Sequence, residues 1–269
     1  MEPVFPYNAI NLVGSGIMRV VTIALPRETV ESLLPHGLEL GRQDLTGPDE
    51  HPVVLHFQEM IRAHMTIPNL LPNLTYHEQV IGVPFTHVSR GLSGPRSGPF
   101  FYMPNLYLDD AIATLGGRFL WGFAKQMANA RVTERSWAVH EGGSDGESSI
   151  SLDFEPTVEE FLPVNRYPHF ESYCKADDGI MVQPLIGMLP AAMGPLFVCS
   201  NWDKKWDDAV VRPLSASVRI EKEIVPALPC GRFPAEGRAP GIDRSPIGAF
   251  ELKARWRLGL IYPTWLHAR

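Results

Sequence analysis

The sequence predicts an α+β domain dominated by β-strands, and three observations support this. The chain of 269 residues has 25 prolines and 23 glycines spread along its length, which divide it into many short segments. Several of these segments are apolar and rich in β-branched or aromatic residues, which favour strands. Residues 248–262 alternate large apolar residues with charged ones, the period-two pattern of a strand with one buried face. Together these features favour a β-rich or α+β architecture.

The first hundred residues are expected to form strands joined by one short helix. Residues 25–35 form this helix, with Pro26 near the first turn, where a missing N–H is harmless, and Pro35 near the end. Turn-forming residues at 89–99 predict a loop. The predicted strands are residues 16–25, 52–59, 75–88 and 100–108.

A second short helix is predicted from Asp109 to Gly116. Its first turn carries two acidic residues, which interact favourably with the helix dipole. Gly116 and Gly117 then offer either a helix end or a close approach of another segment.

The second half of the chain is expected to add further strands. A glycine-rich turn at 142–146 predicts a hairpin between strands 131–140 and 148–155. Residues 214–225 and 248–262 are also strand-like. The apolar, methionine-rich run 184–195 is interpreted as a helix that lines a pocket or contacts another subunit, although methionines more often pack in a core.

Composition and charge limit the classes of function. The formal net charge of -6 argues against nucleic-acid binding. The N-terminal residues lack a signal-peptide pattern, and no run approaches the about 20 apolar residues that span a bilayer. Cys174, Cys199 and Cys230 are widely spaced, so neither a disulfide framework nor a zinc site is indicated. We therefore expect one cytoplasmic domain over residues 1–269, without a membrane or nucleic-acid partner.

Lys125 has the most informative surroundings of any charged residue. The residues just before it are aromatic, aliphatic or glycine, with only Arg118 charged. An unpaired ammonium there costs desolvation free energy, and loss of its proton leaves a nucleophilic amine that forms Schiff bases with ketones. The alternative, which composition alone favours, is a lysine that extends its charged end to water or pairs with an acidic residue.

Three motifs resemble, in order and spacing, those of the acetoacetate decarboxylase superfamily. The most specific is the run from Tyr107 to Lys125, YLDDAIATLGGRFLWGFAK, which is similar to the family's Tyr-Leu-Asp stretch, short helix, Gly-Arg pair and lysine. Tyr76-His77-Glu78 is similar to the family's Tyr-X-Glu. Residues 33–40, LLPHGLEL, are a weaker third match. The matches together cover roughly residues 15–155.

The resemblance implies both a fold and an active site. The implied fold is an α+β architecture with an antiparallel β-sheet closed into a cone or barrel, and Lys125 projects into its apolar interior as the Schiff-base lysine. Glu78 matches the family's active-site glutamate, which contacts the reacting centre or orients an arginine. The alternative for Glu78 is a solvated strand residue, because His77 and Gln79 are polar. Arg118 matches the Gly-Arg pair, where a structural ion pair is as good an interpretation as substrate contact.

The chain also departs from the family pattern at polar positions. Gln126 stands where the decarboxylase has a second lysine, and Phe119 replaces a glutamate. The family's early arginine is matched only approximately, by Arg19, and its other glutamate falls near His56 or Gln58. These changes put acetoacetate itself in doubt as the substrate. The candidate substrate contacts are Arg118, Tyr76, Arg19, His56, Gln126, Phe123 and Trp121.

An iminium on Lys125 withdraws electrons from the adjacent carbon, and this supports two reactions. Superfamily members that lack the full decarboxylase polar set include aldolase-dehydratases. We therefore expect a lyase that favours aldol condensation and dehydration of a pyruvate-like 2-keto acid, with Glu78 or His56 as acid or base. Decarboxylation of acetoacetate or another β-keto acid is the close alternative, and a non-catalytic binder with an apolar pocket is a third. Neither reaction needs a metal or an organic cofactor, and the resemblance implies a homo-oligomer.

Overall fold

One large sheet contains all the strands in the described part of the chain. The computed structural model describes residues 10–67, 72–89, 97–141, 149–167, 179–190, 196–221, 228–236 and 248–264. The strands of the first half are β1 (Asn11–Pro26), β2 (Leu38–Leu40), β3 (Glu50–Met65), β4 (Leu74–Val88), β5 (Ser97–Leu108), β6 (Lys125–Val132) and β7 (Ser136–Glu141). Those of the second half are β8 (Ile150–Pro156), β9 (Leu162–Pro163), β10 (Leu185–Leu189), β11 (Leu196–Ser200), β12 (Trp202–Lys204), β13 (Val210–Ile220), β14 (Gly231–Glu236), β15 (Ala249–Gly259) and β16 (Tyr262–Pro263).

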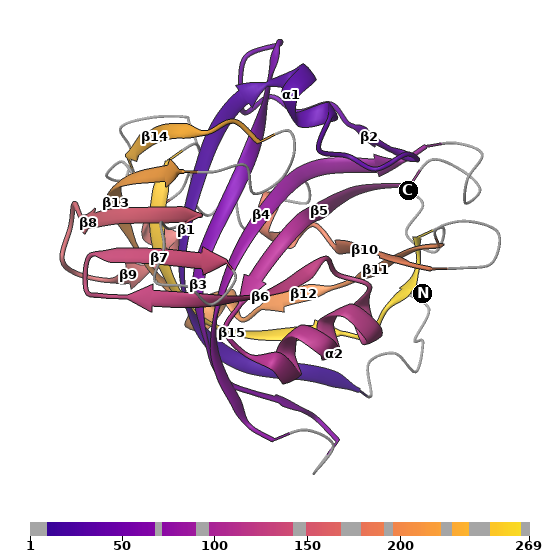
Figure 1. Cartoon of the computed structure of the whole chain (residues 1–269). Helices are drawn as coiled ribbons and strands as arrows, with labels where there is room; N and C mark the ends of the chain where they lie inside the picture. Colours follow the sequence, from indigo (N-terminus) through magenta and orange to yellow (C-terminus); the bar gives the residue numbers. More distant parts are fainter. Residues whose placement is uncertain are drawn as a thin grey trace.

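Nine of these strands form a closed ring, which confirms the predicted cone or barrel. Following hydrogen-bonded neighbours, the ring runs β5-β6-β7-β8-β13-β15-β1-β3-β4 and returns to β5. The long strands β1, β3, β4 and β5 stand side by side, and the shorter β6, β7 and β8 close the ring beside them (Figure 1). The edge strands β10, β11 and β16 extend the sheet beyond β5.

The sheet is mixed rather than purely antiparallel. Strand β5 pairs with β4 along one edge and, along its other edge, pairs in parallel with β10 near its start and with β6 near its end, while the remaining pairs within the ring are antiparallel. A parallel neighbour requires a crossover, and helix α2 (Ala111–Trp121) supplies the one between β5 and β6. This crossover delivers the chain to Lys125 at the first position of β6.

Alternating side chains along the strands build two large apolar cores, and a smaller third cluster contains Phe100, Ile186 and Phe197. One core is the ring interior, to which all nine strands contribute, with Phe57, Trp137 and Leu152 among its buried residues. The other lies on the opposite face of β1, β3, β4, β5 and β15, and includes Met60, Leu106, Trp121 and residues around β10. The second core matters for function because Lys125 reaches into it, as described below.

Helix α2 is longer than the sequence predicted. Asp110 caps its N-terminus by accepting a hydrogen bond from the Ala113 N–H at 2.7 Å, as expected of an acid at this end. The predicted stop at Gly116 and Gly117 is wrong, because the helix continues to Trp121 and ends at Gly122, which has a φ of 67°. Gly117 instead allows the close approach of another segment, the Lys125 side chain, which was the other alternative that the sequence offered.

The other helices are short. Helix α1 (Arg27–Glu31) occupies the centre of the predicted segment 25–35. Among the described residues of the second half, three single-turn helices connect strands: η2 (Val164–Arg166), η3 (Ile180–Val182) and η4 (Trp206–Asp208). No helix in the described ranges is long and apolar enough to cross a membrane.

Two predictions for the second half need correction. The run 184–195 is not a helix where it is described, because residues 185–189 form strand β10 beside β5. The strand predicted at 131–140 is instead the tight β6–β7 hairpin, which breaks at residues 133–135. The β7–β8 pair confirms the second hairpin, although its turn at 142–146 lies outside the described residues.

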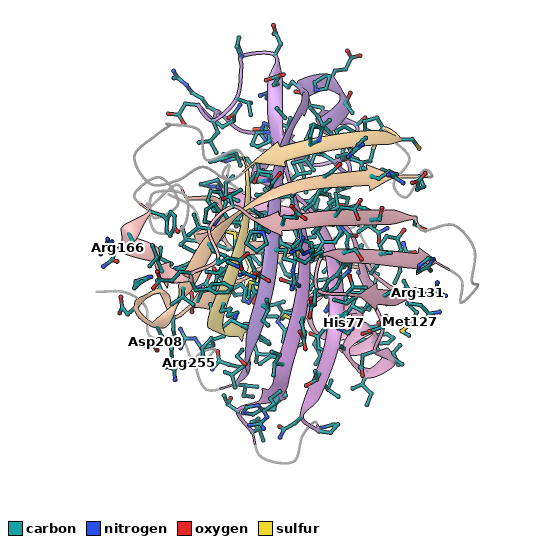
Figure 2. All side chains as sticks on the ribbon, turned by 90° about the vertical axis from the view of Figure 1, so that its left-hand side faces the viewer. His77, Met127, Arg131, Arg166, Asp208 and Arg255 are labelled. Atoms are coloured by element: carbon teal, nitrogen blue, oxygen red, sulfur yellow. The ribbon has the colours of Figure 1, made fainter. Side chains whose placement is uncertain are left out.

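Strand β15 confirms the alternating pattern that favoured a strand, with one exception. Ala254, Trp256 and Leu258 are buried, whereas Lys253, Arg255 and Arg257 are exposed. Arg255 pairs with Asp208 on the surface, and both are labelled in Figure 2. Glu251 belongs to the charged series yet is buried, because it pairs with Arg19 and Arg212.

Candidate active site

Lys125 is buried and paired with Glu78. Its side chain is 9% exposed, and its Nζ lies 3.0 Å from Oε1 of Glu78. Lys125 begins β6, whereas Glu78 lies within β4, so β5 stands between the two strands. Lys125 therefore does not extend its charged end to water, and Glu78 is not a solvated strand residue. The pairing alternative for Lys125 does describe this arrangement, and pairing offsets the desolvation of both charges.

Gln58 holds the other oxygen of the Glu78 carboxylate. It lies directly opposite Glu78 in the β3–β4 pair, and its amide Nε2 donates to Oε2 of Glu78 at 3.0 Å. The carboxylate is therefore fixed between an amide and an ammonium. The amide oxygen of Gln58 is buried with no hydrogen-bond partner in the described residues.

Tyr76 completes the polar corner of the site. Its ring centroid lies 5.9 Å from the Lys125 Nζ, within the range of a cation–π contact. Burial raises the pKa of Tyr76 well above its ordinary value, and the negative charge of Glu78 adds to that effect. Tyr76 therefore stays a neutral phenol.

The rest of the pocket around Lys125 is apolar. Trp121 and Phe123, both predicted substrate contacts, line it together with Tyr76, Glu78 and Lys125. The apolar residues around them come from β1, β3, β4, β5, α2, β10, β12 and β15. The pocket lies in the core outside the ring, so the implied position of Lys125 inside the cone needs correction. Lys125 faces the apolar layer between the sheet and α2.

Helix α2 controls how Lys125 enters the pocket. The Lys125 side chain runs across Gly117, where an added Cβ would overlap its Cδ and Cε atoms. Arg118 is exposed, and its Nε donates to the backbone oxygen of Lys125 at 2.5 Å. Arg118 therefore fixes the backbone of the lysine and does not line the pocket. Phe119 is 77% exposed, so the family's glutamate at this position is replaced by a residue that points to solvent.

Arg19 does not reach the site, although the sequence made it a candidate substrate contact. It points to the opposite face of β1, where its Nη2 lies 2.9 Å from Oε1 of Glu251 and its guanidinium lies 4.5 Å from the centre of the Phe154 ring. Burial lowers the pKa of Arg19, which the charge of Glu251 partly counteracts. A shift of one residue along β1 would have reversed this result. The neighbouring side chains of Met18 and Val20 face the core that contains the pocket, whereas Arg19, between them, faces the other way.

His56 and Gln126 also lie outside the pocket walls. His56 is buried behind Trp202 and Leu185, in a small cavity that it shares with Phe101 and Lys204. Burial, assisted by the charge of Lys204, lowers the pKa of His56 to about 3, so the imidazole is neutral. Gln126 follows Lys125 on β6 and is absent from the described pocket lining. Of the two positions suggested for the family's other glutamate, only Gln58 contacts Glu78.

The opposite face of β4 ties Glu78 to the start of α2. Asp109 accepts hydrogen bonds from the backbone N–H of His77 at 2.7 Å and pairs with its ring Nδ1 at 2.7 Å. This hydrogen bond raises the pKa of His77. The His77 side chain is labelled in Figure 2, on the side of the molecule that carries β6. These contacts between His77 and Asp109 join β4, the strand of Glu78, to the start of α2, the helix that packs on Lys125.

Sequence reasoning missed most of the apolar wall. Met60, Ala63 and Leu74 of β3 and β4, and Trp256 and Leu258 of β15, line the pocket although they are far apart in the chain. The period-two pattern did assign Trp256 and Leu258 to a buried face, but it does not distinguish one core from the other. The described residues contain no group of three or more histidine, cysteine, aspartate or glutamate residues arranged to hold a metal ion.

Comparisons with known proteins agree with the ring-closed sheet. A family model described as acetoacetate decarboxylase (ADC) matches residues 6–156, which include Lys125, Glu78 and Gln58. The chain belongs to the acetoacetate decarboxylase family. Acetoacetate decarboxylase 3 of Mesorhizobium japonicum is 32% identical over 123 residues, which cover 46% of this chain and 37% of that protein. The match thus spans little more than a third of the relative's length.

Solved structures show the same fold. The enduracididine biosynthesis enzyme MppR in complex with pyruvate superimposes with a TM-score of 0.56 at 15% identity, covering 93% of this chain and 88% of that one. The acetoacetate decarboxylase of Legionella pneumophila gives a TM-score of 0.56 at 16% identity, covering 96% and 88%. At such identities the likeness concerns the fold alone.

Proposed function

We propose that this protein is a Schiff-base-forming lyase in which Lys125 attacks the carbonyl of a small keto acid. The observation that carries the proposal is the buried Lys125–Glu78 pair in an otherwise apolar pocket. A structural ion pair would not need an adjoining pocket, whereas a reacting amine needs both a proton acceptor and space for a carbonyl compound.

The pair provides the proton transfers for imine formation. The Glu78 carboxylate takes a proton from the Lys125 ammonium, which leaves a neutral amine that adds to the carbonyl carbon. Glu78 then returns the proton to the carbinolamine oxygen, which leaves as water. The products are an iminium cation, the Glu78 carboxylate and water, so protons and charge balance. Gln58 keeps the carboxylate facing Lys125 throughout.

Decarboxylation of a β-keto acid is the reaction that this pocket supports best. The bond between the α-carbon and the carboxylate breaks, its electron pair enters the iminium, and carbon dioxide leaves a neutral enamine. An apolar pocket disfavours a carboxylate more than neutral carbon dioxide, because it cannot replace the water around the charge. The family model and the Mesorhizobium relative also support this order, which reverses the preference drawn from the sequence.

Aldol condensation with dehydration is the second candidate. Here the Glu78 carboxylate removes an α-proton from the iminium, and the resulting enamine attacks an aldehyde. The site contains the base that this step needs, within hydrogen-bond reach of Lys125. A solved structure of the similarly folded MppR contains pyruvate, which supports testing this reaction in parallel.

Reductive trapping tests the proposal. The protein is incubated with acetoacetate or with pyruvate, cyanoborohydride is added, and the intact mass is measured beside Lys125→Ala. We expect a substrate-sized mass gain that is absent in the variant, together with release of carbon dioxide from acetoacetate. An adduct with pyruvate and no carbon dioxide from acetoacetate would favour the aldol reaction. Ligand binding without any adduct would identify a non-catalytic binder.

A further inference from the structure

A second cavity, distinct from the lysine pocket, lies over four neighbouring strands. It extends across β12, β15, β1 and β3, and its volume is about 870 Å³. Among the described residues, Trp256 alone lines both cavities. We call the second cavity the basic groove because, apart from His64, its charged lining consists of five cations and one anion: Arg62, Lys204, Lys205, Arg255, Arg257 and Asp203.

The charge of the basic groove is opposite to that of the whole chain. The formal net charge of the chain is -6, whereas five lysines and arginines face one aspartate along the groove. A concave surface lined by one sign of charge concentrates its field in the cavity and attracts ions of the opposite sign. The groove therefore attracts anions to a molecule whose net charge otherwise repels them.

The two arginines of β15 are already paired, but only at the surface. Arg255 pairs with Asp208, and both are labelled in Figure 2. Arg257 donates to Oδ2 of Asp203 from Nη2 at 2.6 Å and from Nε at 3.2 Å. All four side chains are about half exposed, and ion pairs of this kind contribute little to stability. Each guanidinium keeps further N–H donors that a ligand can share.

Arg62 and Lys205 are cations that have no acidic partner among the described residues. Both side chains are exposed, and neither makes a hydrogen bond or ion pair within the described part of the chain. The Lys205 N–H donates to the backbone oxygen of Arg255 at 2.9 Å, so Lys205 adjoins the arginines of β15, whereas Arg62 lies across the groove on β3. Lys204 differs from both, because its ammonium is buried and donates to the backbone oxygen of Met181 at 3.1 Å.

A β-bulge turns Arg62 away from the core. In a regular strand, residue 62 would share a face with Met60 and point into the core that contains the lysine pocket. The pairing of β3 shifts register here against both β4 and β1. As a result Ala63 and Met65 join Met60 in that core, and Arg62 is exposed at the groove.

The bulge holds Arg62 in a backbone conformation that favours glycine. Its φ is 52°, in the left-handed region, which costs free energy for any residue with a Cβ. The ring Nδ1 of His64 donates to the backbone oxygen of Arg62 at 2.8 Å and supports this conformation. Glycine would avoid the cost, so the arginine is explained by a use for its side chain in the groove.

We propose that the basic groove binds a small molecule with several negative charges, carried by phosphate or carboxylate groups. Arg62 and Lys205 contact the anion from opposite sides, and the arginines of β15 donate between them, because guanidinium groups match pairs of phosphate or carboxylate oxygens. The four strands separate the backbones of Arg62 and Lys205 by roughly 14 Å. A ligand with one charge would therefore use only part of the groove. This binding does not depend on the chemistry at Lys125.

Calorimetric titration of the intact protein tests the proposed binding. Tripolyphosphate and citrate are the probes, acetate is the monovalent reference, and all solutions have equal ionic strength and no divalent cations. We expect the better of the two probes to bind at least about tenfold more tightly than acetate. Which probe is better shows whether phosphate or carboxylate groups are preferred. Binding should persist in Lys125→Arg, because Lys125 is not part of the groove.

Two variants each remove one of the unpaired cations. We expect Arg62→Gly and Lys205→Gln each to weaken binding of the better probe by at least about tenfold. Arg62→Gly should keep a melting temperature near that of the parent, because glycine adopts a φ of 52° without strain. Arg131→Gln is the control for loss of one positive charge. Arg131 is an exposed residue of β6 outside the described groove lining, and Figure 2 shows it on the opposite side of the view from Arg255.

The remaining outcomes would overturn the proposed binding. They include probes that bind no more tightly than acetate, and equal weakening in Arg131→Gln and the two groove variants. Loss of binding in folded Lys125→Arg would place the anion in the lysine pocket instead. A hexaglutamate peptide that binds more tightly than either probe would identify an acidic protein segment as the ligand of the groove.

Discussion

At the scale of single residues, the site depends on one ion pair whose members play different chemical parts. Lys125 supplies an amine and Glu78 a proton acceptor, and their 3.0 Å separation joins the two. Exposed ion pairs contribute little to stability, but a buried pair is costly to break because it leaves one charge without a partner. Lys125→Ala therefore removes the nucleophile and also leaves Glu78 without its partner, and a variant that keeps the charge separates these two effects.

Lys125→Arg separates charge from nucleophilicity. The guanidinium can still pair with Glu78, so we expect the variant to fold with a melting temperature near that of the parent. It cannot form a Schiff base, so we expect turnover to fall below about a thousandth of the parent rate. Carbon dioxide release and intact mass after reductive trapping measure this loss. Full activity in the arginine variant would rule out the proposed mechanism.

Gln58 is a neutral amide at a position where the resemblance to the family suggests a second glutamate, so the site has one carboxylate in place of two. Gln58→Glu places a second acid against Glu78, and two adjoining carboxylates cannot both ionise at little cost. The added negative charge also stabilises the Lys125 ammonium. We expect the trapping rate to reach its maximum at a pH higher by roughly one unit. The control Gln58→Met adds no charge, so its rate should fall without a shift of the profile, and an unshifted profile in Gln58→Glu would contradict this account.

At the scale of elements, helix α2 shows what local sequence signals predict well and what they do not. The acidic residues at 109–110 correctly predicted where the helix begins, because Asp110 accepts a hydrogen bond from an N–H group in the first turn of the same helix. The glycine pair wrongly predicted where it ends. Position 117 requires glycine because the Lys125 side chain packs against it. Lys125 lies eight residues later in the chain and reaches the helix only because β6 pairs with β5. The glycine pair allowed for a close approach as its second alternative, but no local pattern identifies the residue that makes it.

The two glycines provide a test of that contact within one helix turn. Gly117→Ala would place a methyl group in the path of Lys125, whereas the same change at Gly116 meets nothing within 4 Å. Alanine favours a helix over glycine by up to about 1 kcal/mol at either position. We expect Gly117→Ala to trap substrate at least about tenfold more slowly than Gly116→Ala, because a near-attack geometry is lost. Equal trapping rates in the two variants would show that Lys125 does not depend on this approach.

Strand periodicity explains the remaining successes and failures at this scale. The alternation in β15 located its buried residues, and strands β4 and β5 were predicted close to their observed bounds, whereas β3 continues to Met65, well beyond its predicted end at residue 59. Periodicity alone does not assign a face to one core or the other, and both faces of β1 are buried over much of its length. Arg19 was therefore a reasonable candidate that proved to face away from Lys125.

At the scale of the whole molecule, the motifs predicted the ring-closed sheet while composition alone predicted only a β-rich class. The family motifs lie in residues 33–125, and the pocket needs partners well beyond them, such as Trp202, Trp256 and Leu258. These residues carry no motif because their role is to be apolar and correctly placed. Residue types that are common in every core cannot be recognised as a site wall before the fold is known.

The burial that shapes the two cores also makes the folded protein sensitive to acid. Burial lowers the pKa of His51 to about 4 and that of His56 to about 3, so both rings are neutral in the fold. In the unfolded chain each ring takes up a proton near pH ~6.5. Their contribution to stability is therefore complete above that pH and is lost as the pH falls from about 6.5 towards 3–4.

His56→Gln removes one of these titrations and keeps a polar side chain. The free energy of unfolding in urea, measured from pH 7 down to pH 4.5, should fall less steeply in this variant than in the parent. His36→Gln is the control, because His36 is exposed and should leave the slope unchanged. His77, whose pKa is raised by Asp109, changes stability in the opposite direction, but it does so equally in all three proteins. An unchanged slope in His56→Gln would mean that this imidazole is hydrated, and water would then reach the cavity behind Trp202 that the fold otherwise closes.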